Sequence, residues 1–234
     1  MAGIKQITKR SAKSVRDKAP RKPRVKNQDT WLLKHIDNHL KYTKKWTTKD
    51  VFYPSMLGNP CDRYLYLAYN GKLGDQVIAA KTARIFDHGG SLEVRMKKYF
   101  ERTGIYLASE QSVKLNNPPI SGRYDFLLKH EEFGRVLLEL KSINDKGFSA
   151  LIDSPKPEHL LQLQIYLNLV GIENGVVLYE NKNDQALKAF KVSKNEKAWN
   201  DVLERCMRIQ SMVPLDMPTH CTGEFYCGCR EVYK

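Results

Sequence analysis

SGRYDFLLKHEEFGRVLLELK, residues 121–141, is the stretch that decides the fold. It predicts two apolar strands joined by a polar turn, with Asp125 in the first strand and Glu139 and Lys141 at the end of the second. Because side chains in a strand alternate between faces, Glu139 and Lys141 share one face and the leucines beside them share the other. If the strands pair, Asp125 can lie beside Glu139, and clustered carboxylate oxygens suit a hard divalent cation.

Asp125 followed by the triplet that starts at Glu139 and ends at Lys141 resembles the PD-(D/E)XK nuclease superfamily, although Tyr124 stands where the family name has proline. The resemblance implies an α/β fold, a restriction-endonuclease-like core with a central mixed sheet flanked by helices. It also implies that Asp125 and Glu139 hold Mg²⁺ or Mn²⁺ and that Lys141 orients or activates the attacking water. From the residues alone, the alternative is a turn at Asp125 and two solvated charges on an edge strand.

The composition describes a basic chain of 234 residues, long enough for one domain with appendages. Lys and Arg number 39 against 26 Asp and Glu, and the resulting net charge of +13 favours a polyanionic partner such as DNA. No apolar run reaches the length of a membrane span, and the first residues lack the apolar core of a signal peptide. A cytoplasmic protein that does not contact membranes is therefore expected.

The chain divides into three expected parts. Residues 1–29 carry ten basic and two acidic residues, which accounts for +8 of the net charge, and have too little apolar content to fold alone. They form either a flexible arm that grips phosphates or a merely solubilising tail, with an organelle transit peptide as a weaker option. Residues 30–212 are the expected nuclease domain, which opens with an amphipathic helix over 30–42 that docks on the core. Residues 213–234 are a cysteine-rich tail.

A helix over residues 83–103 carries Glu93 four residues after Gly89, and the glycine pair at 89 and 90 interrupts its beginning. This G-x-x-x-E arrangement is similar to the first motif of RecB-like nucleases, in which an acidic or histidine side chain faces the metal. Glu93 is therefore a third expected metal ligand. The alternative is a surface ion pair between Glu93 and Lys97.

A second helix, over residues 158–170, places Gln162 and Tyr166 on one face. The Q-x-x-x-Y pair resembles the RecB-type subgroup, in which it lies beside the metal and contacts the nucleic-acid strand. Strands are expected over 175–180 and 186–192, followed by a helix over 196–212.

The sequence has five cysteines. Cys206 falls on the apolar stripe of the last helix and is expected in the core. The four others are Cys61, at the start of a helix, and Cys221, Cys227 and Cys229 in the tail. In a reducing compartment such a set indicates a metal site, and four thiolates suit either Zn²⁺ or an iron-sulfur cluster.

Cys61 and the three tail cysteines resemble the ligands of iron-sulfur RecB-type nucleases, including the CRISPR adaptation nucleases. That resemblance implies a 4Fe-4S cluster that staples the ends of the catalytic domain together. The tail spacing departs from the family pattern, and His220 can replace one thiolate if the ion is a structural Zn²⁺.

The motifs together imply a Mg²⁺- or Mn²⁺-dependent deoxyribonuclease, an exonuclease on single strands or duplex ends, used in recombination, repair or replication with a partner protein. Many relatives of this size come from bacteria and phages. An endonuclease of the same fold is the first alternative. A catalytically inactive, metal-stapled DNA-binding subunit is the second.

Overall fold

The computed structural model describes residues 30–45, 50–222 and 227–230. The expected basic arm, residues 1–29, and parts of the expected tail, 223–226 and 231–234, lie outside the described residues. Among the described residues, no helix is both long enough and apolar enough to cross a bilayer.

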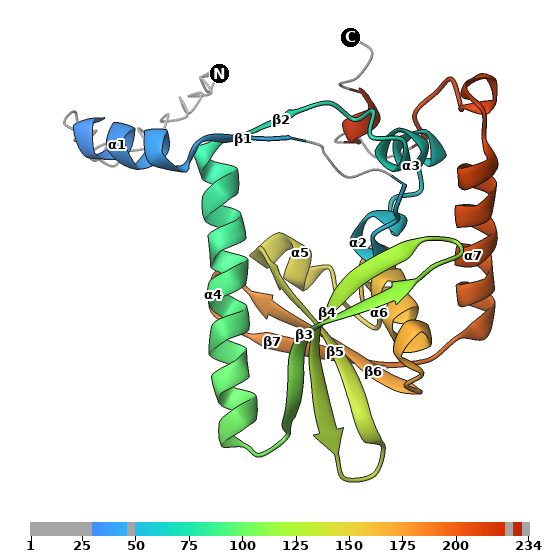
Figure 1. The fold of residues 1–234 in the computed structure, drawn as a ribbon. Coiled ribbons are helices and arrows are strands. Elements are labelled where there is room, and N and C mark those ends of the chain that lie inside the picture. Colours follow the sequence, from blue (N-terminus) through green and yellow to red (C-terminus); the bar gives the residue numbers. More distant parts are fainter. Residues whose placement is uncertain (1–29, 46–49, 223–226, 231–234) are drawn as a thin grey trace, which may run out of the picture.

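A mixed five-stranded sheet forms the centre of the molecule (Figure 1). Its strands, in spatial order, are β3 (Tyr106–Leu115), β4 (Ile120–His130), β5 (Gly134–Ile143), β6 (Asn174–Asn181) and β7 (Leu187–Ser193). Only the β5–β6 pair is parallel, which requires a crossover, and α6 (Pro157–Val170) supplies its main helix. The predicted α/β core with a mixed sheet flanked by helices is confirmed.

Helices cover both faces of this sheet. The long helix α4 (Ala80–Arg102) lies along one face, while α6 and then α7 (Glu196–Ser211) lie on the other (Figure 1). The shorter helices are α1 (Thr30–Leu40), α2 (Pro54–Leu57), α3 (Asp62–Tyr69), α5 (Asp145–Ser149) and the 3₁₀ turns η1 (Pro214–Asp216) and η2 (Gly228–Arg230). A separate ribbon pairs β1 (Tyr42–Lys44) with β2 (Gln76–Ile78) and joins α3 to α4.

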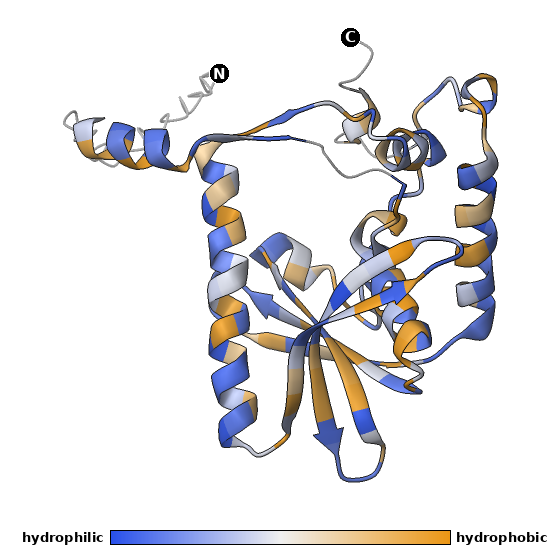
Figure 2. Cartoon of the chain, in the orientation of Figure 1, coloured by the Kyte–Doolittle hydropathy of each residue, from blue (hydrophilic) through white to orange (hydrophobic). Residues whose placement is uncertain are grey.

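Strand β5 is apolar on both of its faces, towards α4 and towards α6, along most of its length (Figure 2). Leu138 and Leu140 pack in a cluster that contains Leu92 of α4. Leu137, on the opposite face, packs in a cluster that contains Leu163 of α6. Glu139 and Lys141 lie two and four positions after Leu137 and so point to the same face of the strand. The strand therefore presents its charged side chains towards α6.

Helix α1 differs from its expected packing. The helix forms where its apolar spacing predicts it, but none of its eleven described residues is buried. It lies against α4 through an Asp37–Arg84 ion pair of 2.5 Å, and its apolar residues, Trp31 among them, are exposed. The expected docking on the core is therefore wrong.

Helix α4 begins earlier than its sequence indicates. It starts at Ala80 and continues through Gly89 and Gly90 without a break, although glycine is a poor helix former. Packing of Leu92 and Met96 against the sheet outweighs that propensity.

Candidate active site and cysteine cluster

Strands β4 and β5 stop pairing through their backbones next to the expected site. The ladder runs from His130↔Gly134 to Phe126↔Leu138, so Asp125 is the next residue on β4 and lies across from Glu139. Beyond that point, the amide of Leu140 donates to Oδ2 of Asp125 at 2.7 Å. The carboxylate thus takes the place of a strand carbonyl, and this bond fixes Asp125 beside β5.

Glu139 is the most deeply buried charged side chain of the site, with 1% of its surface exposed. The ammonium of Lys141 lies 2.5 Å from its Oε1, yet neither carboxyl oxygen receives a hydrogen bond of ordinary geometry from the described residues. Burial, and then the negative charge of Asp125, raise the pKa of Glu139 to about 8, and Lys141 opposes that shift. Buried carboxylate oxygens without donors are rare in proteins, so this donor set fits a divalent cation.

The pKa of Asp125 is also raised, because burial outweighs the opposing effects of Lys141 and of the Leu140 amide. Burial lowers the pKa of Lys141, but the charges of Glu139 and Asp125 outweigh this effect, and the net shift of its pKa is upward. Lys141 therefore stays protonated at neutral pH. An ammonium has no lone pair, so in this state it can donate hydrogen bonds to water or phosphate but cannot accept a proton.

Glu93 projects from α4 and is partly buried. Its pKa is raised by burial, then by Asp125 and by Glu110, which places these carboxyl groups near one another. Lys97, the expected partner in the surface-pair alternative, instead pairs with Glu101 at 3.8 Å.

An Arg95–Glu180 ion pair fixes α4 over the sheet. Nη2 of Arg95 lies 2.6 and 2.7 Å from the two carboxyl oxygens of Glu180, whose side chain is almost fully buried. Because Arg95 is two residues after Glu93 and Glu180 is on β6, this contact positions the part of α4 that carries Glu93.

Gln162 and Tyr166 are both buried on α6. The pKa of Tyr166 is raised above its usual range by burial and by the charges of Glu139 and Asp125, so α6 brings its phenol close to the carboxylates. A Cβ at Gly122 would lie 2.9 Å from the Tyr166 ring, which explains why the strand has glycine there. The structure thus brings together all six residues that the motifs predict.

Two further residues near this site escaped sequence reasoning. Glu110, on β3, pairs with Arg123 and was missed because its strand was not predicted. His159 Nδ1 lies 2.8 Å from the hydroxyl of Tyr179, and burial together with the charge of Lys141 lowers the pKa of His159 to about 3. His159 is therefore a neutral ring at physiological pH. Its position on the Gln162 face of the helix was its only signal in the sequence.

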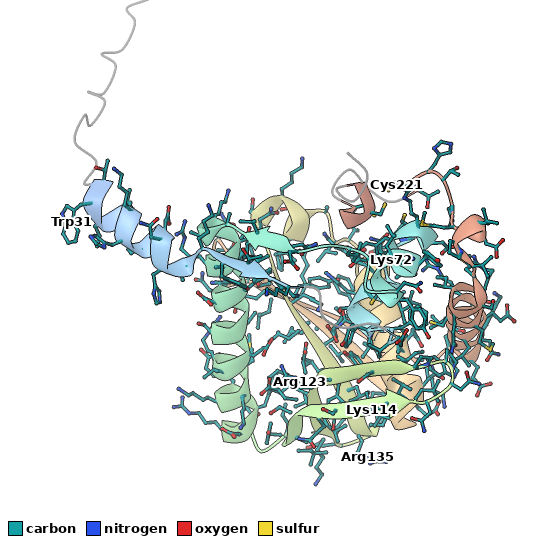
Figure 3. All side chains as sticks on the ribbon, turned by 45° about the horizontal axis from the view of Figure 1, so that its top comes forward. Trp31, Lys72, Lys114, Arg123, Arg135 and Cys221 are labelled. Atoms are coloured by element: carbon teal, nitrogen blue, oxygen red, sulfur yellow. The ribbon has the colours of Figure 1, made fainter. Side chains whose placement is uncertain are left out.

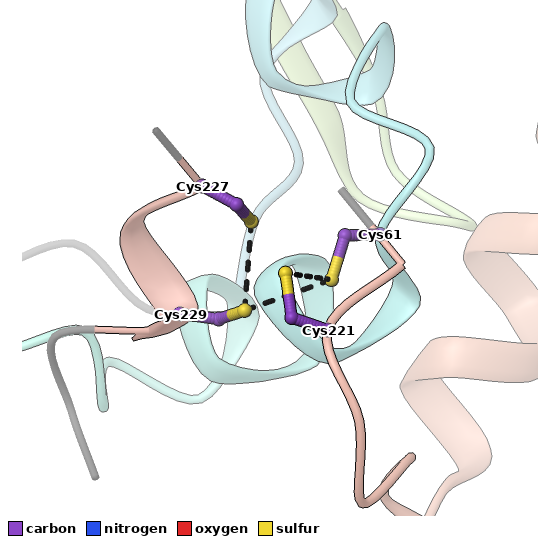
Figure 4. Close-up of side chains that lie close together, drawn as sticks. All are labelled: Cys61, Cys221, Cys227 and Cys229. Atoms are coloured by element: carbon purple, nitrogen blue, oxygen red, sulfur yellow. Dashed lines mark hydrogen bonds between the residues drawn. The ribbon is translucent and has the colours of Figure 1, made fainter. Parts of the chain in front are cut away.

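The cysteine cluster lies between the start of α3 and the tail (Figure 4). The sulfurs of Cys61, Cys221, Cys227 and Cys229 all lie within 4.8 Å of one another. The closest pairs are Cys227–Cys229 at 3.5 Å, Cys61–Cys229 at 3.7 Å and Cys61–Cys221 at 3.8 Å. Four such thiols can hold a metal.

The sulfur separations can be compared with those that each expected metal requires. A tetrahedral Zn²⁺ with bonds of about 2.3 Å places its sulfurs about 3.8 Å apart, close to the separations in this cluster. A 4Fe-4S cluster puts four irons and four sulfides between its cysteines and so needs wider spacing. The described arrangement fits a single ion, and the tail would have to move outward to hold a cluster.

Local hydrogen bonds position Cys61. Its Sγ caps α3 by accepting from the amide of Tyr64 at 3.4 Å, and its own amide donates to Asn59 Oδ1 at 2.9 Å. Burial raises the pKa of the Cys61 thiol, but the backbone hydrogen bonds outweigh it, so the net shift is downward, as expected for a cysteine at a helix start. Cys206 is fully buried in the core, as predicted.

Two arginine side chains link α3 and the segment before it to α7 and to the tail. Arg205 of α7 donates to Asp62 at 2.8 Å and to the carbonyls of Leu57 and Asn59 at 3.0 and 2.7 Å. Arg63 donates to the Pro218 carbonyl at 3.2 Å. The cluster is thus held between three segments that are far apart in sequence.

The sheet order and the convergence of Asp125, Glu139 and Lys141 are those expected of a PD-(D/E)XK nuclease-like fold. Among characterised proteins, the chain is similar to the CRISPR-associated exonuclease Cas4 of Saccharolobus solfataricus, with 27% identity over 151 residues that cover 63% of this chain and 70% of that protein. The predicted resemblance is thereby confirmed.

Two solved structures can be compared with this chain. The alkaline exonuclease LHK-Exo from Laribacter hongkongensis is 13% identical, with a TM-score of 0.49, over 76% of this chain and 90% of that one. A phage-related exonuclease from Haemophilus somnus 129PT is 14% identical, with a TM-score of 0.42, over 52% and 67%. No protein-family model matches the chain.

Proposed function

We propose that this protein is a Mg²⁺- or Mn²⁺-dependent deoxyribonuclease that acts as an exonuclease. The observation that carries the proposal is the buried Glu139 carboxylate, which lies between Asp125 and Lys141 and whose Oε2 has no hydrogen-bond partner among the described residues. The similarity to a protein named a CRISPR-associated exonuclease supports the choice of exonuclease.

Glu93, Asp125 and Glu139 would hold the catalytic cation. When bound, the cation lowers the pKa of water and offsets charge on the phosphate in the transition state. Lys141, as an ammonium, would orient the attacking water and stabilise the charge that develops on the phosphate oxygens. Hydrolysis joins the water oxygen to phosphorus and breaks the bond to the leaving sugar oxygen, which departs as a hydroxyl group.

Gln162 and Tyr166 would position the scissile strand. Both lie on the helix that faces the carboxylates, and the raised pKa of Tyr166 keeps its phenol protonated as a hydrogen-bond donor. Flanking phosphates have basic side chains available on both sides: Arg123 on β4, and Lys146 and Lys156 in a surface hollow of about 470 Å³ beside α5. The arm at 1–29 would add contacts that do not depend on sequence.

Residues 30–212 would form the nuclease domain, and the tail at 213–234 would close a metal site with Cys61. A single Zn²⁺ is the ion that the sulfur separations support, and the 4Fe-4S cluster implied by the resemblance is the other candidate. Metal analysis of the purified protein decides: about one zinc per chain and a colourless solution, or iron with visible absorbance. Such a nuclease would work in the cytoplasm of a bacterial or phage-infected cell with a recombination or replication partner.

The test uses end-labelled linear DNA, a matched covalently closed circle and Mg²⁺. The wild-type chain should degrade the linear DNA and spare the circle. Asp125→Asn and Lys141→Met should lose cleavage and keep DNA binding, while the control Lys129→Met, at the other end of β4, should match the wild type. Cleavage of the circle would indicate the endonuclease, and DNA binding without any cleavage the inactive subunit.

A further inference from the structure

Glu110 has an unusual backbone conformation in the middle of an edge strand. Its φ is +54°, in the left-handed region that residues other than glycine rarely adopt. The residues on either side remain paired with β4, as Ser109↔Phe126 and Gln111↔Tyr124, so the conformation is not that of a turn. Local strain of this kind persists when the surroundings require it, and it often re-aims a side chain at a functional site.

The register of β3 places Glu110 opposite Asp125 on β4. Its Oε1 lies 3.0 Å from Nη2 of Arg123, the residue two positions before Asp125. Arg123 is labelled on β4 in Figure 3. Both members of this pair are open to solvent, with 53% of the Glu110 side chain and 61% of the Arg123 side chain exposed. Solvent-exposed ion pairs contribute little to stability, so this pair can exchange partners readily.

The carboxylates around the site outnumber the cationic side chains. Four carboxylates surround it: Glu93, Glu110, Asp125 and Glu139. The cationic groups beside them in the described chain are Arg123 and Lys141. If all six are ionised, the formal charge is −2, and Oε2 of the buried Glu139 has no hydrogen-bond partner among the described residues, while Oε1 faces the ammonium of Lys141. That second, independent observation points to a cation in the space between them.

We infer that Glu110 is a further cation-binding carboxylate of this site and that Arg123 masks it until another anion engages the guanidinium. The inference rests on the proposed function and adds to it a residue outside the motifs that suggested it. A phosphodiester of the DNA substrate is the natural competitor for Arg123, because guanidinium groups bind phosphate oxygens with two parallel hydrogen bonds. Substrate binding would then release Glu110 to the cation, and cation binding would be linked to the presence of DNA.

The experiment measures Mn²⁺ binding to the full chain by electron paramagnetic resonance and calorimetry, without DNA, so the readout is independent of cleavage. Arg123→Gln should tighten Mn²⁺ binding, because Glu110 is released. Without DNA, Glu110→Gln alone should leave Mn²⁺ binding near the wild-type level, because Arg123 already masks this carboxylate. In the Arg123→Gln background, Glu110→Gln should weaken Mn²⁺ binding by about tenfold, the scale seen when a group that supports a metal site is removed. In the double variant, the tightening by Arg123→Gln should disappear.

Glu101→Gln is the matched control, because Glu101 is also in an exposed ion pair, with 47% of its side chain exposed. It should bind Mn²⁺ as the wild type does. Tightening by Arg123→Gln that persists in the double variant would be a general charge effect and would overturn the role of Glu110. Mn²⁺ binding that is lost in Asp125→Asn but not tightened by Arg123→Gln would leave the proposed function standing and refute this inference alone. A wild-type chain that binds no Mn²⁺ would refute both.

Discussion

Replacing Glu139 with glutamine should stabilise the folded chain at neutral pH while abolishing DNA cleavage. The substitution keeps the shape of the side chain and removes a buried carboxyl group that the fold must keep protonated, or hold charged next to Asp125. Catalytic carboxylates of this kind are held at a cost to stability, so function and stability should change in opposite directions.

The magnitude follows from the pKa of Glu139, which is 4.5 in an ordinary setting and about 8 in the fold. A raised pKa means that the folded chain binds this proton more tightly than the unfolded chain does. The contribution of this proton to the free energy of unfolding is therefore complete below pH 4.5 and is lost as the pH rises towards 8. At about 1.4 kcal/mol per pH unit, the loss is on the order of 1 kcal/mol at pH 5 and 3 kcal/mol at pH 7. Glutamine does not titrate and avoids this loss, although the broken contact with Lys141 offsets part of the gain.

Urea unfolding of both proteins at pH 5 and pH 7, without added divalent ions, measures the effect. A chelator is avoided because it can empty the cysteine cluster. Glu139→Gln should gain stability mainly at pH 7, and added Mn²⁺ should stabilise the wild type but not the variant. For the exposed control Glu101→Gln, the difference in unfolding free energy from the wild type should be the same at pH 5 and pH 7. Equal destabilisation by Glu139→Gln at both pH values would show that the buried charge does not weaken the fold.

Four other substitutions test separate parts of the structure. Gly89→Ala should raise the urea midpoint by an amount equivalent to about 0.5–1 kcal/mol, because no described heavy atom lies within 4 Å of the added Cβ; a lower midpoint would show that the helix needs this glycine. Gly122→Ala should lower the free energy of unfolding by about 1–3 kcal/mol, because the new Cβ would lie 2.8 Å from Pro54 and 2.9 Å from the Tyr166 ring. It should also slow DNA cleavage, and a Tm equal to that of the wild type would contradict this prediction. Cys229→Ser should lower bound metal and Tm together, whereas Cys206→Ser should lower Tm alone; unchanged metal in the first would exclude Cys229 as a ligand.

The strands that carry the site could be predicted because their composition is unambiguous. Residues 121–141 contain two apolar segments on either side of a polar turn, and β4 and β5 form there. Spacing also fixed which residues share a face, since Glu139 and Lys141 alternate with leucines that pack against α4. The predicted clustering of Cys61 with the tail is confirmed for the same kind of reason, because four thiols without disulfide partners favour a shared metal.

The edge strand β3 could not be predicted, because it is mostly polar and half exposed, and it is held by its ladder with β4 rather than by propensity. Its omission hid Glu110, whose position depends on register and on one backbone angle. Helix α1 shows the opposite failure. Its apolar spacing resembles that of a docked helix, but periodicity cannot tell which surface, if any, receives the apolar face.

The two halves of the molecule divide stability and chemistry between them. The carboxylate site weakens the fold, since Glu139 and Asp125 are buried near each other with raised pKa values. The cysteine cluster can compensate, because it joins Cys61 to Cys221 across 160 residues of sequence, and a cross-link that closes a long loop removes much of the unfolded chain's entropy. A metal held there, between α3 and the tail, would stabilise the chain through side chains other than the carboxylates. Metal removal should therefore lower Tm in Glu139→Gln and in the wild type by the same amount, since the two effects involve no shared side chain.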